Sequence, residues 1–311
     1  MRHWNRFGAV VLATAVLFSA LPAASQVLPD VPDGAQAVSL GGEPLSPAAP
    51  SQGLLDNLAQ ARADYALDPN DADNIIWLGR RIAYTGDYRG AIEAFSEGVE
   101  KHPGDARMYR HRGHRYITIR EFDRAIADLE KAAELIEGTE NEIEPDGAPN
   151  ELGIPISSLH GNIWYHLGLA YYLKHDFENA LRAYTNGYNA SRNDDNRVST
   201  THWRYMILCR AGRPRDAKAV LVDIVPDMNI IENHSYHSLS LFYKGELSLD
   251  ELVGDTEDNP AGSAVMYGAA NWHYCDGQKE QAVAMLEDIV STNSWAAFGF
   301  IAAEADLAAL D

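Results

Sequence analysis

Small and apolar residues recur along this chain every 34 residues, and this repeat restricts the possible folds more than any other feature of the sequence. The pairs that keep the step are Gly79 and Gly113, Tyr88 and Phe122, Ala91 and Ala125, Phe95 and Leu129, and Gly98 and Ala132. A fixed period of about 20 to 50 residues is typical of proteins in which each unit buries its apolar face against its neighbours. The sequence therefore predicts a linear array of repeated units.

The clearest unit surrounds Gly168. Trp164, Leu167, Gly168 and Tyr171 are spaced three, one and three residues apart, so they form one stripe on a helix. Glycine costs about 1 kcal/mol of helix propensity relative to alanine. Its expected benefit is steric, because the missing side chain lets a second helix approach closely, and Ala180 is the small residue expected to face it. Each unit is therefore predicted to be a pair of packed helices.

Residues 164–184 fit the pattern W-x2-L-G-x2-Y followed by A-x3-aromatic, and here the chain resembles the tetratricopeptide repeat family. The motifs agree well over about residues 72–137 and 161–193 and are degenerate over 198–290. The chain departs from the family pattern at Trp77, which lies two positions late, and at Arg112, where leucine is usual. The resemblance implies an all-α fold, a right-handed superhelical solenoid of about six helical hairpins with capping helices.

Residues 1–25 have the composition of a secretory signal peptide. Two arginines precede an apolar run from Val10 to Leu21, and small residues precede an expected cleavage before Gln26. The run is shorter than the roughly 20 residues of an ordinary membrane-spanning helix. We therefore expect cleavage, no stable membrane span afterwards, and export of a bacterial type to the periplasm or beyond the cell. The alternative is a membrane anchor that is retained.

Residues 26–51 are rich in Pro, Ala and Gly without an apolar period, and we interpret them as a flexible linker before a repeat domain of residues 52–311. Within that domain, residues 138–158 interrupt the period and carry five acidic residues and three prolines. This acidic insertion is either a solvated excursion, as charge-rich segments usually are, or a flap over the groove of the solenoid, because loops on such scaffolds often carry function.

The first helices of successive tetratricopeptide repeats line a concave groove, and the resemblance places a basic patch there. Arg107, Arg110 and His114 share one helix face, and Arg80 lies one repeat earlier. Guanidinium groups suit carboxylates and aromatic rings provide rigid contact area, which favours an acidic peptide or the C-terminus of a chain as the ligand. In the alternative, these arginines pair with carboxylates of neighbouring repeats or of the acidic insertion. The expected groove residues are Arg80, Tyr84, Arg107, Arg110, His114, Tyr165 and Tyr172.

These features predict an exported, non-catalytic protein that binds a peptide or a partner protein in its groove. A formal net charge of −20 argues against nucleic acid as a partner, since phosphate binding needs clustered cations. The sequence contains no phosphate loop, nucleophile elbow or paired-cysteine zinc motif, and we expect no cofactor. The alternatives are a structural or self-assembling envelope component that uses the convex face, and an enzyme with a site of unrecognised type.

The chain has two cysteines, Cys209 and Cys275, which fall on first helices two repeats apart. Adjacent packed helices lie about 8–10 Å apart, whereas a disulfide needs Cα atoms within about 7 Å. We therefore expect free thiols, although export would permit a disulfide. A metal site formed by Cys209, His273 and Cys275 lacks the close ligand spacing of zinc motifs, so no metal is expected.

Overall fold

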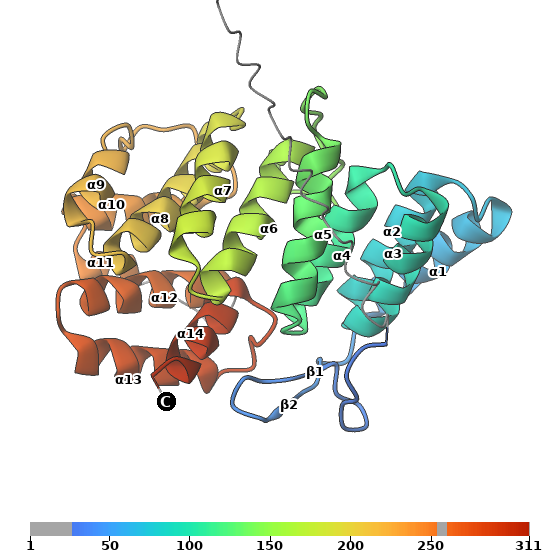
Figure 1. The fold of residues 1–311 in the computed structure, drawn as a ribbon, viewed down its shortest axis with the longest axis horizontal. Helices are drawn as coiled ribbons and strands as arrows, with labels where there is room; N and C mark the ends of the chain where they lie inside the picture. The colour runs from blue at the N-terminus through green and yellow to red at the C-terminus, as the bar shows by residue number, and fades with distance from the viewer. Residues whose placement is uncertain (1–26, 254–259, 311) are drawn as a thin grey trace, which may run out of the picture. The chain divides into compact units, whose positions relative to one another are not determined.

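The computed structural model describes residues 27–253 and 260–310 (Figure 1). By its contacts the chain divides into Met1–Asp30 and Val31–Asp311, and all helices of the described part belong to the second unit. The signal peptide expected at residues 1–25 lies outside the described residues. None of the helices in the described part is long and apolar enough to cross a membrane.

The described residues are almost entirely helical, and consecutive helices pair as six hairpins from α2–α3 to α12–α13, with α1 before them and α14 after them (Figure 1). The helices are α1 (Gln52–Leu67), α2 (Ala72–Tyr84), α3 (Tyr88–Lys101), α4 (Ala106–Thr118), α5 (Phe122–Leu135), α6 (Leu159–Leu173), α7 (Phe177–Asn189), α8 (Asp194–Arg210), α9 (Pro214–Val220), α10 (His234–Lys244), α11 (Leu249–Val253), α12 (Pro260–Cys275), α13 (Lys279–Val290) and α14 (Phe298–Ala308). The expected all-α helical repeat solenoid with capping helices is confirmed.

Side-chain caps and repeated glycines explain why these hairpins form. Asp71 and Asp105 accept hydrogen bonds from backbone amides in the first turns of α2 and α4, which satisfies donors that a helix leaves unpaired. A Cβ on Gly168 would lie 2.6 Å from a ring carbon of Tyr184, so α6 and α7 approach closely only because that atom is missing. Ala180, which we expected to face Gly168, is buried in the same hairpin.

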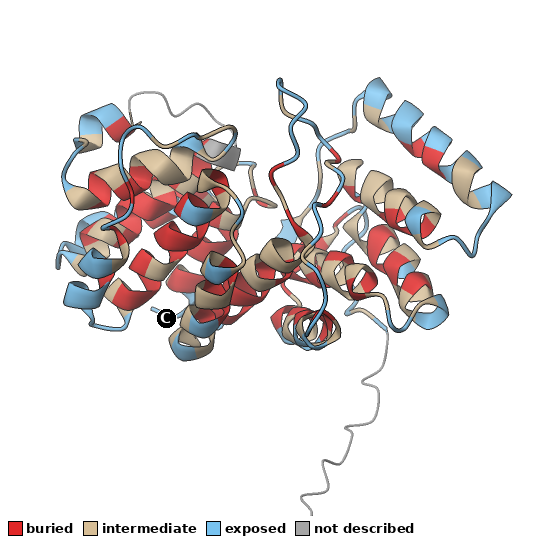
Figure 2. Ribbon diagram, turned by 90° about the horizontal axis from the view of Figure 1, so that it is seen from above, coloured by how far each residue is buried: buried red, intermediate tan, exposed pale blue. Residues whose placement is uncertain are grey.

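Burial follows this arrangement, with buried residues on the sides of helices that face other helices (Figure 2). In α1 the buried residues are Leu58 and Ala61, as expected for a helix that covers one end of an array. Helix α14 is different, since eight of its eleven residues are buried. The last helix therefore belongs to the core as well as ending the array.

The acidic insertion connects α5 to α6 and pairs with itself at its base. Ile143 and Ser158 form an isolated antiparallel bridge, and the amide of Leu159 donates to the carbonyl of Glu142 at 2.9 Å. Residues 144–157 therefore form a loop whose two ends are adjacent.

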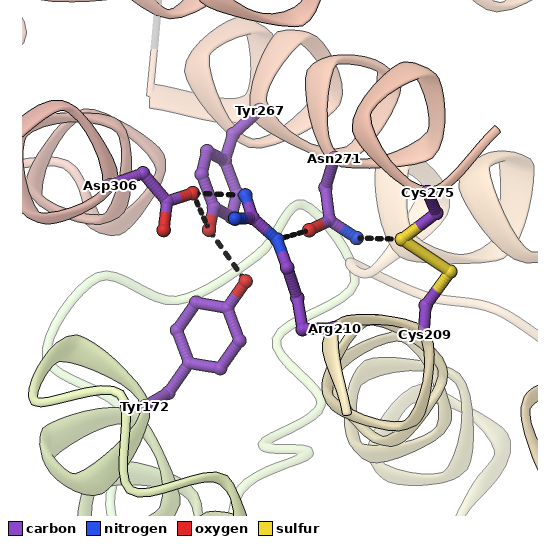
Figure 3. Close-up of a disulfide and its surroundings, with 7 residues drawn as sticks. All are labelled: Tyr172, Cys209, Arg210, Tyr267, Asn271, Cys275 and Asp306. Atoms are coloured by element: carbon purple, nitrogen blue, oxygen red, sulfur yellow. Dashed lines mark hydrogen bonds and ion pairs between the residues drawn. A yellow bond between two sulfur atoms is a disulfide. The ribbon is translucent and has the colours of Figure 1, made fainter. Parts of the chain in front are cut away.

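The C-terminal helices turn back onto earlier ones. Helix α12 packs on α8 as well as on α10, and α14 packs on α6 and α12. As a result, the Cα atoms of Cys209 and Cys275 lie 5.9 Å apart and the two residues form a disulfide (Figure 3). This corrects our expectation of free thiols. That expectation assumed one helix spacing for every repeat and did not allow for direct packing of α12 on α8.

The segment before α1, which we interpreted as a flexible linker, makes defined contacts. Strand β1 (Ala37–Val38) pairs antiparallel with β2 (Pro44–Leu45). Between them, the amide of Leu40 donates to Glu304 Oε1 of α14 at 2.6 Å. Backbone groups of this segment thus find partners within the hairpin and on the last helix, and the two ends of the second unit meet.

Candidate functional site

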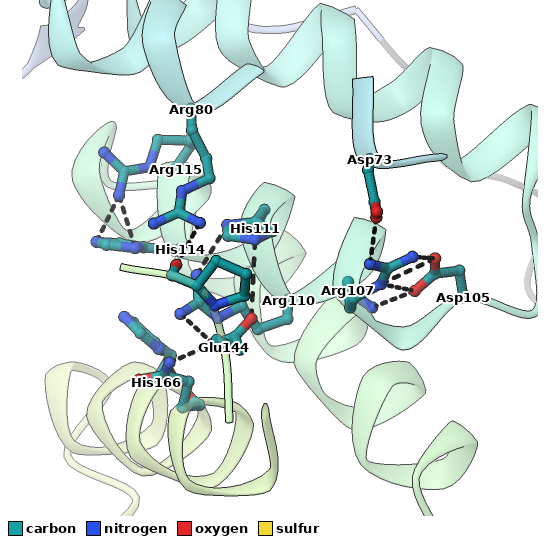
Figure 4. Close-up of polar contacts among 12 residues, drawn as sticks. Asp73, Arg80, Asp105, Arg107, Arg110, His111, His114, Arg115, Glu144 and His166 are labelled. Carbon is teal, nitrogen blue, oxygen red and sulfur yellow. Dashed lines mark hydrogen bonds and ion pairs between the residues drawn. The ribbon is translucent and has the colours of Figure 1, made fainter. Parts of the chain in front are cut away.

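Helices α2, α4 and α6 lie side by side, and the acidic insertion crosses the face that they form, which we call the groove face. Between the insertion and this face lies a cavity of about 230 Å³, which we call the basic cavity. Its lining includes Arg80 of α2, Arg110 and His114 of α4, His166 of α6, and Glu144 of the insertion (Figure 4). The fold therefore brings side chains from three consecutive first helices to one space.

Two arginines of α2 hold the backbone of the insertion. Arg80 Nη1 donates to the carbonyl of Pro145 at 2.8 Å, and Arg81 Nη1 donates to the carbonyl of Gly147 at 3.1 Å. A Cβ on Gly147 would lie 2.0 Å from the hydroxyl of Tyr84, so the loop fits closely against α2. The insertion therefore lies as a flap on the groove face.

The carboxylate of Glu144 is the acidic anchor of the flap. Arg110 Nη2 lies 2.7 Å from Glu144 Oε2, and Asn162 of α6 donates to the same oxygen. The ring of His111 lies 3.8 Å from the other carboxylate oxygen. The side chains of Arg110 and Glu144 are 11% and 9% exposed, so water screens this pair weakly. For Arg110, the structure shows the pairing with the acidic insertion that we weighed as the alternative to an open groove.

Arg107 lies apart from the basic cavity (Figure 4). Its guanidinium group is 2.6 Å from Asp73 on α2 and 2.6 Å from Asp105, the cap of its own helix. These two carboxylates hold Arg107 at the N-terminal end of α4, whereas the cavity lies beside the middle of the helix. The shared helix face expected for Arg107, Arg110 and His114 is therefore divided between two environments.

Tyr84 and Tyr165 border two different spaces. Tyr84 lines the basic cavity, where Arg80 Nη2 donates to its hydroxyl at 3.4 Å. Tyr165 lines a second pocket of about 260 Å³ that shares Asn162 and His166 with the basic cavity. The hydroxyl oxygen of Tyr165 accepts a hydrogen bond from Trp203 Nε1 at 3.0 Å. The two spaces are therefore neighbours, and residues of the insertion line both of them.

Tyr172 is part of the core rather than of a surface groove, since it is 1% exposed. Its hydroxyl lies 2.6 Å from that of Tyr267 on α12, and Tyr267 donates to Asp306 on α14 at 2.8 Å. Arg210 pairs with the same carboxylate (Figure 3). The C-terminal helices therefore cover the place where the resemblance put the far end of the groove.

Burial keeps the histidines of the basic cavity neutral. The pKa of His166 falls to about 3 because of burial and of the nearby charge of Arg110. The pKa values of His111 and His114 also lie well below the ordinary value, first because of burial and then because of Arg110 and Arg115 respectively. Burial lowers the pKa of Arg115 to about 10, so this guanidinium stays charged at neutral pH. The positive charge of the cavity therefore comes from arginines alone.

Sequence reasoning missed several residues of this space, namely His111, Arg115, Glu144 and His166. Arg115 is one of five arginines from Arg107 to Arg120, but it does not occupy one of the helix positions that the resemblance turns toward the groove. His166 lies inside the tetratricopeptide motif at a position that the motif does not specify. No pattern in the sequence indicates that Glu144 forms an ion pair with Arg110.

The described residues contain no group of three or more His, Cys, Asp or Glu side chains placed to hold a metal ion. Cys209 and Cys275 are joined to each other, so their sulfurs are not thiolates that could serve as ligands beside His273. What the basic cavity offers chemically is a set of fixed cationic and neutral hydrogen-bond donors, which suits recognition of an anionic group.

No protein-family model matches the chain, and no match is found among curated proteins. Among solved structures, the chain is similar to YrrB, described as a TPR protein with an unusual peptide-binding site, at 15% identity and a TM-score of 0.43, over 74% of this chain and 91% of YrrB. It is also similar to a tetratricopeptide repeat protein from Parabacteroides merdae, at 12% identity and a TM-score of 0.47, over 80% of this chain and 92% of that one. The consecutive hairpins of the described residues define a helical repeat solenoid.

Proposed function

We propose that this chain is an exported, non-catalytic interaction protein that binds a peptide or a partner protein on its groove face. The observation that carries the proposal is that this face already holds a polypeptide, the chain's own residues 144–157. The contacts use chemistry that an extended peptide offers, since two backbone carbonyls and one carboxylate accept from three arginines. First helices of consecutive hairpins supply such a face in solenoid proteins.

The same contacts suggest what the partner carries. A segment with a carboxylate in the position of Glu144 would meet Arg110 and Asn162, and its next carbonyl groups would meet Arg80 and Arg81. The formal net charge of the chain is −20, so this basic face is an exception on an acidic protein. We infer that an acidic, extended segment is the binding element of the partner.

Export is part of the proposal and has a separate test. The chain begins with an apolar run of signal-peptide type, and a disulfide joins Cys209 to Cys275, a bond that persists in oxidising compartments. We propose a periplasmic or secreted location. Intact-mass spectrometry of protein recovered from the periplasm or the medium should show a chain that begins at Gln26, and a chain that retains Met1 there would contradict the proposed cleavage.

A loop replacement tests binding on the groove face. Ile143 and Ser158 are already bridged, so an Asn-Gly turn in place of residues 144–157 joins them with little disturbance. A labelled peptide with the sequence of residues 142–158 is then titrated in trans, with fluorescence anisotropy as the readout. We expect saturable binding to the loop variant and weaker binding to the intact chain, because the tethered insertion competes.

Two neutral substitutions in the loop variant locate the contact. Arg110→Gln should weaken peptide binding at least about tenfold, because it removes a charge-assisted contact. Arg107→Gln removes the same charge from the same helix outside the cavity and should leave the affinity unchanged. A loop variant that keeps its helical circular dichroism but binds no peptide, or that binds equally well with Arg110→Gln, would overturn the assignment of the groove face.

A further inference from the structure

The basic cavity holds more cationic charge than its own carboxylates neutralise. The guanidinium groups of Arg80, Arg110 and Arg115 line it, together with the carboxylates of Glu144 and Asp146. Glu144 pairs with Arg110. Within residues 27–253 and 260–310, no carboxylate forms an ion pair with Arg80 or Arg115. With the three histidines neutral, the lining carries a net positive charge.

The donors of these arginines are only partly used. Arg115 Nη2 donates to the ring of His114 at 2.6 Å, which is a neutral partner. The buried Nε of Arg110 has no hydrogen-bond acceptor among the described residues. A partly buried charge without a counter-charge is poorly solvated, and a buried donor without an acceptor is costly. The lining therefore has the features of a site that an anion completes.

The size of the cavity limits the anion to a small one. A volume of about 230 Å³ lies below the roughly 300–1,000 Å³ of pockets that hold drug-sized ligands. Phe95 and Ala83 form an apolar part of the wall, and Pro145 and Pro155 of the insertion form another. Apolar walls reduce water access and strengthen the field of the arginines at the centre.

We propose that the basic cavity binds a small free oxyanion, either a short carboxylate or a tetrahedral anion of the phosphate type, between Arg80, Arg110 and Arg115. Guanidinium forks match both kinds of anion in geometry. The insertion roofs this site, so the site exists when the flap is closed. It is therefore a different site from the one that a peptide would occupy in place of the flap. This assignment does not depend on peptide binding by the groove face.

Isothermal titration of the intact chain tests the proposal. The probes are inorganic phosphate, sulfate, succinate and citrate, each at matched ionic strength in a buffer free of oxyanions. We expect saturable binding of one ion per chain for at least one probe. Binding of phosphate and sulfate alone would assign a tetrahedral anion, and binding of succinate or citrate would assign a carboxylate.

Matched substitutions distinguish a built site from general attraction. Arg115→Gln should weaken binding at least tenfold, and Arg80→Gln, on a different helix, should weaken it as well. Arg107→Gln removes a charge from the same helix as Arg115 but outside the cavity, so binding should be unchanged. The proposal is overturned if no probe binds at concentrations up to ~10 mM, if Arg115→Gln and Arg80→Gln bind like the unmodified chain, or if Arg107→Gln loses affinity to the same extent.

Discussion

Single buried histidines couple the stability of this protein to pH. His202 is 1% exposed, and its ring stacks on Tyr243 with centroids 5.8 Å apart. Burial lowers its pKa to about 3, whereas an unfolded chain has a histidine pKa near the ordinary value of about 6.5. Between these two values the unfolded state binds a proton that the folded state does not. Stability is therefore complete above about pH 6.5 and declines as the pH falls through that window.

Replacing His202 with Gln should reduce the loss of stability in acid. The glutamine keeps polar atoms near Tyr243 but does not titrate. Between pH 7 and pH 5, one histidine with this shift accounts for about 2 kcal/mol of the free energy of unfolding, and the variant should lose that much less. Urea unfolding at both pH values measures the difference. An identical loss in both proteins would show that His202 does not contribute.

The close approach of α6 and α7 at Gly168 depends on the lack of a Cβ atom. Gly168→Ala should lower the free energy of unfolding by about 1–3 kcal/mol, because the new methyl group would overlap the ring of Tyr184. This outcome is opposite to the gain of up to about 1 kcal/mol that helix propensity alone predicts. Gly53 in α1 is the matched control, since a Cβ there meets nothing within 4 Å. Gly53→Ala should be neutral or stabilising in the same urea titration.

Part of the lining of the basic cavity could be predicted from the sequence. Helical spacing and the family resemblance pointed to Arg80, Tyr84, Arg110 and His114, and the structure brings these four to one cavity. The resemblance gave no reason to include Arg115, because Arg115 does not occupy one of the helix positions that face the groove in the family. Its long side chain nevertheless reaches the cavity. Sequence spacing cannot determine which of several nearby carboxylates an arginine selects.

At the scale of elements, α14 is held by a buried ion pair that links it to the second hairpin. Arg120 Nη2 lies 2.6 Å from Glu304 Oε2, and the two side chains are 4% and 7% exposed. Arg120 also donates to the carbonyls of Thr118 and Trp295. Removing one partner of such a pair leaves a buried charge without compensation. The pair therefore joins α14 to the turn between α4 and α5.

Glu304→Gln should lower the free energy of unfolding by about 3–5 kcal/mol, because Arg120 would remain charged without its carboxylate. The glutamine keeps an oxygen for the amide of Leu40, so the effect reports the lost charge. Glu134→Gln is the control, since its pair with Lys131 has side chains that are 67% and 38% exposed, and its effect should stay within about 0.5 kcal/mol. Thermal and urea unfolding monitored by circular dichroism compare the two variants. Equal losses of stability in the two variants would show that the buried pair contributes no more than the exposed one.

For the whole molecule, the 34-residue period predicted a linear array of units that bury their faces against one another, and the resemblance to the tetratricopeptide repeat family supplied the all-α solenoid. The period carried no information about contacts between distant units. The disulfide between α8 and α12 and the packing of α14 on α6 depend on the C-terminal hairpins turning back. The insertion likewise is not part of the repeat. The sequence therefore left two alternatives for it, a solvated excursion and a flap over the groove.

The ion pair between Arg120 and Glu304 also affects how the chain folds during its synthesis. The two residues are 184 positions apart, and ribosomes make proteins from the N-terminus. In an ordinary repeat array, early hairpins complete their contacts as soon as their neighbour emerges. Here the second hairpin carries a cation whose counter-charge is made 184 residues later. The second hairpin of a nascent chain therefore reaches its final arrangement only after α14 has been made.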